Sequence, residues 1–126
     1  MPTKPWVTFR RPDADQECLV LLTELPLRHF RDLGRFLVYT WRIQDQLKHA
    51  PGLLGYSLLA SIFRRQFWTL SVWVGEAPLR QFVAEKPHAQ VMTALRGKMG
   101  QTHFVRWRIR GADFPPSWDD ALTKRR

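Results

Sequence analysis

Cysteine is almost absent from this sequence, which has one, Cys18, among 126 residues. A single thiol cannot form an intrachain disulfide, and its neighbours in the stretch ECLVLL indicate a small buried hydrophobic side chain. Apolar runs are far too short to cross a bilayer, and the charged N-terminus lacks the apolar segment of a secretory signal. We therefore expect a cytoplasmic protein that has no membrane partner.

The usual motifs of metal and cofactor chemistry are also missing. The four histidines (His29, His49, His88 and His103) are too far apart in the sequence to suggest a metal site. The sequence contains no phosphate-binding loop, no dinucleotide-binding glycine fingerprint and no nucleophile elbow. These absences predict a protein that works without a metal ion or a bound cofactor.

Basic residues are abundant but dispersed. Lys and Arg number 20 against 11 Asp and Glu, which gives a formal net charge of +9. Specific recognition of nucleic acid is typical of basic residues that cluster on one face or helix. Because these residues are spread along the whole chain, the sequence predicts a solvated basic surface and no specific nucleic-acid partner. An anion-binding role for part of that surface stays open.

Hydrophobic periodicity divides the chain into strands and helices. The segments that have the composition and period of strands are residues 17–25, 53–63, 66–74 and 102–110. The segments that repeat with the helical period are residues 30–50, 76–86 and 87–99. The first helix is amphipathic, and its apolar arc contains Leu33, Phe36, Leu37, Ile43 and Leu47.

The order β-α-β-β-α-β predicts an α+β fold of the ferredoxin-like type, in which a four-stranded antiparallel sheet carries both helices on one face. Residues 17–110 would form this domain, residues 1–16 an N-terminal arm, and residues 111–126 a C-terminal tail anchored by Trp118. The strands are apolar on both sides, so the second face of the sheet must also be covered. A second copy of the chain, packed sheet to sheet in a homodimer, is the simplest candidate.

Three stretches, GYSLLAS, FWTLSVWVGEAPLRQFV and PHAQVM, resemble the antibiotic-biosynthesis-monooxygenase-like branch of the dimeric α+β barrel superfamily. In that branch a strand ending in LSVW runs directly into a helix. The resemblance covers residues 17–110 and implies a dimeric α+β barrel. The superfamily includes cofactor-independent oxygenases, haem-degrading enzymes, isomerases and sensor domains, so the fold does not settle the activity.

The same resemblance raises haem as an alternative cofactor. Haem-degrading members hold an iron-ligating histidine on the second helix, at a fixed distance from the Trp of a VW pair. Counting that distance from Trp73 leads to Met92, and His88 lies one helical turn earlier on much the same face. Haem binding through a shifted His88 is therefore a further alternative to the absence of a cofactor.

His88 is also the candidate catalytic residue. It follows Pro87, a residue suited to the first turn of a helix, and it shares a helical face with Val91 and Met92. A neutral imidazole there can act as a general base, and a nearby helix N-terminus would lower its pKa. The alternative is a structural histidine that hydrogen-bonds a backbone carbonyl across the bend.

Polar and aromatic residues at otherwise apolar positions are candidates for substrate contact. These are Thr40, Trp41, Gln44, Ser71, Trp73 and His103. Buried polar groups either bond to one another or line a cavity, and tryptophans either wall an aromatic site or pack in the core. The sequence leaves both alternatives open for each residue.

The leading functional hypothesis is a small-molecule enzyme similar to cofactor-independent monooxygenases, which acts on an aromatic or polyketide-like substrate in a pocket between the helices and the sheet. Carbanions of such substrates react with O₂ directly, so the lack of a cofactor motif is compatible with this chemistry. The second hypothesis is a non-catalytic ligand-binding or structural homodimer of the same fold. The third is a haem-binding protein.

Overall fold

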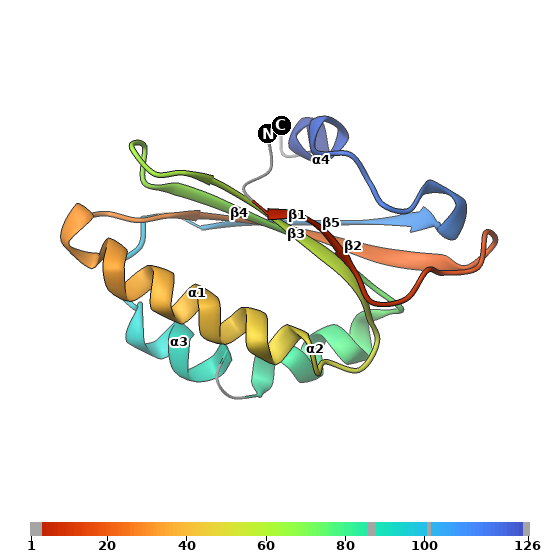
Figure 1. Ribbon diagram of the computed structural model, residues 1–126, viewed down its shortest axis with the longest axis horizontal. Helices are drawn as coiled ribbons and strands as arrows, with labels where there is room; N and C mark the ends of the chain where they lie inside the picture. The colour runs from red at the N-terminus through yellow and green to blue at the C-terminus, as the bar shows by residue number, and fades with distance from the viewer. Residues whose placement is uncertain (1–3, 86–87, 101, 125–126) are drawn as a thin grey trace.

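The architecture is one antiparallel sheet with helices on both sides (Figure 1). The structure, a computed structural model, describes residues 4–85, 88–100 and 102–124. Within these ranges the strands are β1 (Lys4–Thr8), β2 (Glu17–Pro26), β3 (Leu53–Ser61), β4 (Gln66–Trp73) and β5 (His103–Arg110). Their order across the sheet is β1-β3-β4-β2-β5, and all neighbouring pairs are antiparallel.

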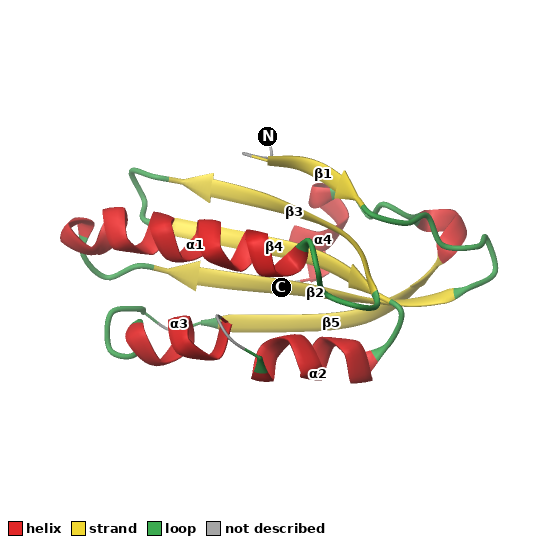
Figure 2. Cartoon of the chain, turned by 60° about the horizontal axis from the view of Figure 1, so that its bottom comes forward, coloured by secondary structure: helices red, strands yellow, loops and turns green. Residues whose placement is uncertain are grey.

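Three helices lie on one face of the sheet and a fourth lies on the other (Figures 1 and 2). The first three are α1 (Leu33–Leu47), α2 (Glu76–Ala84) and α3 (His88–Ala94), and the fourth is α4 (Trp118–Lys124). Short 3-10 turns precede α1 and α4, at Phe30–Asp32 and Gly111–Asp113. The predicted α+β ferredoxin-like arrangement is confirmed. The predicted break at Pro87 concerns a residue outside the described ranges.

The sheet has five strands in the described residues where the sequence predicts four. The additional strand, β1, lies in the segment predicted as an arm and pairs with β3, with Val7 opposite Tyr56 and Thr8 opposite Gly55. Its sequence KPWVT is short and shows no alternation, so the free edge of β3 determines its conformation more than local preference does. Pro5 is tolerated because β1 is itself an edge strand.

The segments on either side of the predicted domain bind each other. The backbone N–H of Gly111 donates to the carbonyl of Gln16 at 2.7 Å, and that of Ala112 donates to the carbonyl of Ala14 at 3.0 Å. Gly111 is buried at this contact. The arm and the tail are therefore parts of one packed unit.

A buried hydroxyl fastens α4 to the sheet. Trp118 Nε1 donates to Ser57 Oγ at 2.9 Å, and Ser57 Oγ donates to the carbonyl of Lys4 at 2.7 Å. Ser57 is fully buried on β3, and Ala121 on α4 is fully buried in the same cluster as Cys18 and its neighbours on β2. Trp118 is thus an anchor, and it joins α4, β3 and β1.

Both faces of the central strand β2 are buried, as its sequence predicts. Cys18, Val20 and Leu22 face α4, whereas Leu19 faces the layer formed by α1 and α2. The chain's own helix α4 and the Phe114 ring therefore supply part of the cover that the sequence assigned to a second copy. The residues of this face that stay half-buried include Trp68, Val105, Trp107 and Ile109.

Helix α1 is amphipathic, but its buried side differs from the predicted arc. Phe36 and Leu47 are buried, whereas Leu37 is 46% exposed and Trp41 is 73% exposed. The rings of Phe36 and Phe67 on β4 are 4.4 Å apart between centroids, and this contact sets the rotation of the helix. Leu37 then lies about 100° further round, on the outer side.

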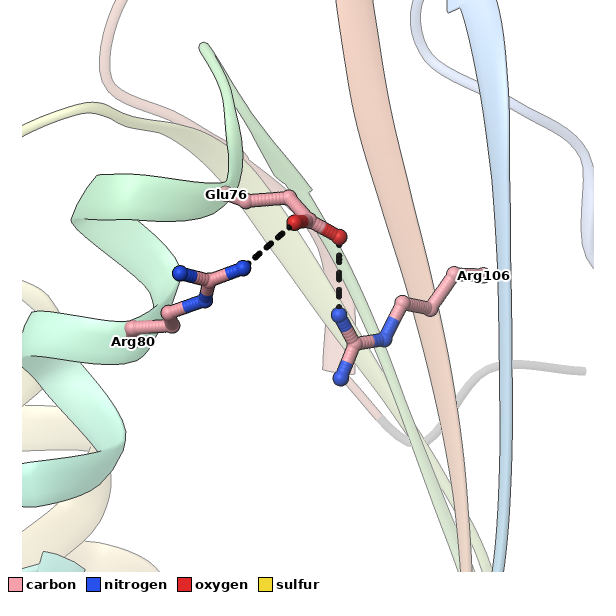
Figure 3. Close-up of polar contacts among 3 residues, drawn as sticks. All are labelled: Glu76, Arg80 and Arg106. Carbon is pink, nitrogen blue, oxygen red and sulfur yellow. Dashed lines mark hydrogen bonds and ion pairs between the residues drawn. The ribbon is translucent and has the colours of Figure 1, made fainter.

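An exposed ion-pair bridge ties the start of α2 to the edge strand β5 (Figure 3). Glu76 Oε2 accepts from Arg80 at 2.9 Å, one turn along α2, and Glu76 Oε1 accepts from Arg106 on β5 at 2.9 Å. The hydrogen bond from Arg106 and the charge of Arg80 lower the pKa of Glu76. Exposed pairs contribute little to stability, so this bridge mainly orients α2.

Candidate functional site

A groove of about 480 Å³ lies between α1 and the end of α2. Its lining residues are Trp41, Arg42, Asp45, Gln46, His49, Ala50, Pro51, Phe82 and Glu85. A second groove of about 580 Å³ separates α1 from α3, and Arg42 lines both. The first groove has the size of a small-molecule site, and it combines aromatic walls with a few polar groups.

Trp41 is the residue of this groove that the sequence predicts as a substrate contact. It lies on the outer side of α1 with 73% of its surface exposed, which is far more than a core tryptophan shows. Phe82, on α2, is buried and also lines the groove. An exposed indole and a buried ring that line the same groove can each hold a flat aromatic ligand by offset stacking.

The polar residues of the groove escaped prediction. Arg42, Asp45 and Gln46 fall on the polar face of the α1 pattern, where the sequence indicates only solvent, and His49 follows the last helical turn. These residues line a groove because α2 packs alongside α1. The contact between the helices joins Gln46 and Phe82, which are 36 residues apart in the sequence. A pattern within one helix contains no signal for such a neighbour.

Gln46 joins three helices at the floor of the groove. Its Nε2 donates to the carbonyl of Phe82 at 3.1 Å, and its Oε1 accepts from the backbone N–H of His88 at 2.9 Å. The end of α2 and the start of α3 are therefore held by one side-chain amide from α1.

His88 lies at the start of α3, half-buried, behind Gln46 and Phe82. Its Nδ1 is 3.2 Å from the carbonyl of Val83, and its ring centroid is 5.1 Å from that of Phe82. A carbonyl oxygen only accepts hydrogen bonds, so Nδ1 bears the proton and Nε2 has the free lone pair. His88 thus makes a structural hydrogen bond through Nδ1 and still has Nε2 available to act as a base.

Burial lowers the pKa of His88, and the hydrogen bond to Val83 opposes that shift in part. The cause is desolvation of the imidazolium, which is the charged form. His88 is consequently neutral at pH 7. A neutral imidazole with a free Nε2 is the form that accepts a proton.

The polar residues predicted on the inner side of α1 have partners inside the protein. Thr40 Oγ1 donates to the carbonyl of Phe36 at 3.0 Å, within the helix. Gln44 Oε1 accepts from the hydroxyl of Tyr56 on β3 at 3.3 Å, and Tyr56 is 2% exposed. Gln44 thus faces the sheet, and neither residue lines either groove.

Ser71 and Trp73 on β4 form a second internal pair. Trp73 Nε1 donates to Ser71 Oγ at 2.9 Å, and both residues are buried. The Trp73 ring lies 5.4 Å from the ring of Phe82, so it supports the residue that lines the groove. An aromatic row from Trp73 through Phe82 to His88 connects the core with the groove.

His103 is not brought near the other candidates. It begins β5, is exposed, and pairs with Glu24, which also pairs with Trp68. Because directly paired residues share a face, His103 lies on the α4 side of the sheet, whereas Ser71 and Trp73 lie on the side of α1 and α2.

The described residues do not fit haem at the positions that the sequence suggests. Neither His88 nor Met92 lines either groove, so neither offers an axial ligand at the wall of a cavity. Among the described residues, no three His, Cys, Asp or Glu side chains gather as metal ligands.

No helix in the described residues combines the length and apolar composition needed to cross a membrane.

Comparison with known proteins gives matches at the level of structure. No family profile matches the sequence, and no curated protein matches it either. The cofactor-independent oxygenase SnoaB of Streptomyces nogalater superposes with a TM-score of 0.62 and 16% identity, over 80% of this chain and 99% of that one. An antibiotic biosynthesis monooxygenase superposes with a TM-score of 0.64 and 13% identity, over 71% of this chain and 95% of that one.

A third match is a ferredoxin-fold protein of Listeria monocytogenes that is related to antibiotic biosynthesis monooxygenases. Its TM-score is 0.58 at 17% identity, over 71% of this chain and 54% of that one. Identities this low establish a common fold and leave the activity open. The chain thus has the α+β ferredoxin-like fold of the antibiotic biosynthesis monooxygenases, as the resemblance in its sequence predicts.

Proposed function

We propose that this chain is a small-molecule enzyme of the cofactor-independent oxygenase type, which acts on a flat aromatic or polyketide-like substrate in the groove between α1 and α2. The observation that carries the proposal is a neutral, half-buried His88 immediately behind a groove walled by Trp41. The fold shared with the oxygenase of Streptomyces nogalater supports it.

In the proposed reaction, His88 Nε2 accepts a proton from an activated CH₂ group of the substrate through one water molecule, because His88 lies behind the lining of the groove and not in it. The resulting carbanion transfers electrons to O₂ and forms a peroxide anion at that carbon, which takes the proton back from His88 to become a hydroperoxide. Loss of water from the hydroperoxide gives a ketone, so CH₂ and O₂ become C=O and H₂O. The substrate supplies all the electrons, and no cofactor enters the balance.

The groove residues have distinct roles in this proposal. Trp41 stacks on the substrate ring, and the Arg42 guanidinium stabilises the enolate oxygen that develops on deprotonation. Thr40, Gln44, Ser71 and Trp73 touch a substrate only if it displaces their internal hydrogen bonds. We therefore place them behind the wall of the site.

The proposal predicts that Trp41→Ala weakens the binding of flat hydroxylated aromatics. Loss of one ring contact removes about 0.5–1.5 kcal/mol, which is roughly a twofold to thirteenfold rise in Kd. Isothermal titration calorimetry with a panel of naphthols and anthrones measures the change, and an oxygen electrode follows turnover of any ligand found. The matched control is Phe63→Ala, which removes a 91% exposed ring from the β3–β4 hairpin, outside the groove. Equal affinities for both variants would contradict a site at Trp41.

A non-catalytic ligand-binding protein is the second candidate function. The observation in its favour is that Thr40, Gln44, Trp73 and the Nδ1 atom of His88 all have hydrogen-bond partners within the chain. Under this alternative, Trp41→Ala still weakens ligand binding, but no aromatic in the panel is consumed with O₂. Oxygen uptake therefore separates the two functions.

We also propose that the protein is a homodimer. Two indole N–H groups on the α4 side of the sheet, Trp68 Nε1 and Trp107 Nε1, are buried without an acceptor among the described residues. Val105 and Ile109 remain half-buried beside them. Because both N–H groups are already buried within one chain, a second copy does not reach them, but it covers the half-buried apolar side chains beside them.

The dimer should bury more than about 1,000 Å² in total and persist at micromolar concentration. Light scattering coupled to size-exclusion chromatography should therefore give twice the chain mass of 14.9 kDa. A mass of one chain at micromolar concentration would contradict the homodimer.

A further inference from the structure

The Gln46 side chain, which projects from α1, contacts the end of α2 and the start of α3. Its amide nitrogen reaches the last turn of α2 at Phe82, and its amide oxygen reaches the first residue of α3 at His88. These contacts span 36 and 42 residues of sequence. The amide therefore determines how the two short helices lie with respect to α1.

The contact at His88 satisfies a donor that the helix cannot satisfy itself. The first N–H groups of a helix have no intrahelical acceptor, and a side-chain oxygen commonly fills that role. That oxygen usually comes from a residue just before the helix. Here it comes from α1, so the start of α3 is fixed to the groove wall.

Three restraints then act on the His88 residue. Gln46 holds its backbone nitrogen at 2.9 Å, the carbonyl of Val83 holds Nδ1 at 3.2 Å, and the ring of Phe82 packs against the imidazole. Gln46 makes the first of these restraints directly, and it also bonds the backbone carbonyl of Phe82, whose ring makes the third. Release of Gln46 therefore loosens the backbone of His88 and, with it, the alignment of Nδ1 on the Val83 carbonyl.

We infer that Gln46 is a positioning residue, which holds His88 in the Nδ1–H tautomer with Nε2 available as the base. The inference rests on the proposed function, since it assigns the residue that makes His88 competent in that site. Gln46 also lines the groove, so a ligand there contacts the same amide that sets the histidine. The residue acts through His88 and performs no chemistry itself.

Charged neighbours must be separated from this effect. The groove beside Gln46 is lined by Arg42 and Asp45 from α1, by His49 after α1 and by Glu85 after α2, while the α3 sequence HAQVMTA contains no other titratable group. The lowered pKa of His88 results mainly from burial, which the hydrogen bond to Val83 opposes, so any substitution that alters the packing around His88 also changes that pKa. The tautomer is a more specific readout, because it depends on which ring nitrogen has a fixed hydrogen-bond acceptor.

The test is ¹⁵N NMR of histidine-labelled protein at a pH where His88 is neutral, comparing wild type with Gln46→Met and Gln46→Glu. Wild type should show a single tautomer with the proton on Nδ1. Gln46→Met removes both hydrogen bonds, and we expect both tautomers in exchange. Gln46→Glu keeps an acceptor for the His88 N–H, so it should retain the Nδ1–H tautomer, while its carboxylate raises the pKa of His88. Gln81→Met, which removes an amide bonded only to Glu85 in the described residues, is the control and should match wild type.

A single Nδ1–H tautomer in folded Gln46→Met, or an Nε2–H tautomer in wild type, would overturn the inference. If Gln46→Met does not fold, Gln46→Glu decides, because an unchanged His88 pKa there shows that residue 46 does not reach His88. None of these spectra needs a substrate, so they stand even if no oxygenase activity is found. Where turnover is measured, Gln46→Met should lower kcat by up to about 10²-fold, with a smaller effect on KM.

Discussion

Replacing His88 with alanine should lower turnover of an oxidisable aromatic substrate by roughly 10²- to 10⁴-fold, the usual contribution of a general base. The free energy of unfolding should fall by only about 1 kcal/mol, because the carbonyl of Val83 is near the surface and water can replace the lost donor. An oxygen electrode and urea denaturation measure the two effects on the same preparation.

The matched control is His49→Ala. His49 also has its Nδ1 3.2 Å from a carbonyl, that of Asp45, but it is exposed at the end of α1 and lines the groove directly. We expect its replacement to reduce turnover far less than that of His88. A larger loss of turnover in His49→Ala than in His88→Ala would indicate that His49 is the base. A large loss of stability in His88→Ala with unchanged ligand affinity would indicate that His88 has a structural role.

The pH profile provides an independent check on His88. Its pKa in the folded protein lies below the unfolded value of about 6.5, so the neutral form persists further into acid. Turnover should therefore be level near pH 7 and decline only as pH falls through the lowered pKa. The unfolded chain takes up the proton first, so the stability due to neutral His88 is present above about pH 6.5 and is lost as pH falls. His88→Ala should lack that part of the pH dependence.

Gly111→Ala should be the most destabilising single methyl addition to the chain, with a loss of about 3 kcal/mol or more in the free energy of unfolding. A Cβ at position 111 would lie 2.8 Å from the carbonyl carbon of Asp13 and would overlap the carbonyl oxygen. Both obstacles are backbone, so neither can move without breaking the bonds between the two segments. Urea denaturation followed by circular dichroism measures the loss.

Gly34→Ala makes the same chemical change where no atom lies within 4 Å of the new Cβ. Gly34 is in α1, so the substitution should stabilise the protein by up to about 1 kcal/mol through helix propensity. The two substitutions should thus change the free energy of unfolding in opposite directions. A loss below about 1 kcal/mol in Gly111→Ala would show that the segment around Asp13 yields easily.

The sequence predicts the elements whose pattern is local. The strand around Leu19, the hairpin through Arg64 and the alternating strand at Trp107 all lie where periodicity places them. The failures are contacts between distant segments. β1 forms because β3 has a free edge, and the rotation of α1 follows from the contact between Phe36 and Phe67, which no single helix reveals.

The residues of the candidate site differ in the same way, because some are noticeable in the local sequence and others only from their contacts with distant segments. Trp41 and His88 could be selected because a tryptophan beside the apolar arc of a helix and a histidine after a proline are noticeable in the sequence itself. Gln46 could not, since an amide on a polar helix face is ordinary until its partners Phe82 and His88 are known. Thr40 and Gln44 were noticeable as polar residues on an apolar arc, and their partners prove to be the carbonyl of Phe36 and the hydroxyl of Tyr56.

The strand order also has a consequence for how this protein folds. β2 lies between β4 and β5, yet its pairing with β5 places Glu17 opposite Arg110, which is 93 positions further along the chain. Such non-local pairing is slow, because a large loop must close before any contact compensates for its entropy. Until β5 docks, β2 presents a bare, strongly apolar edge that can template pairing with another chain. Aggregation during refolding should thus compete with the arrival of the final strand.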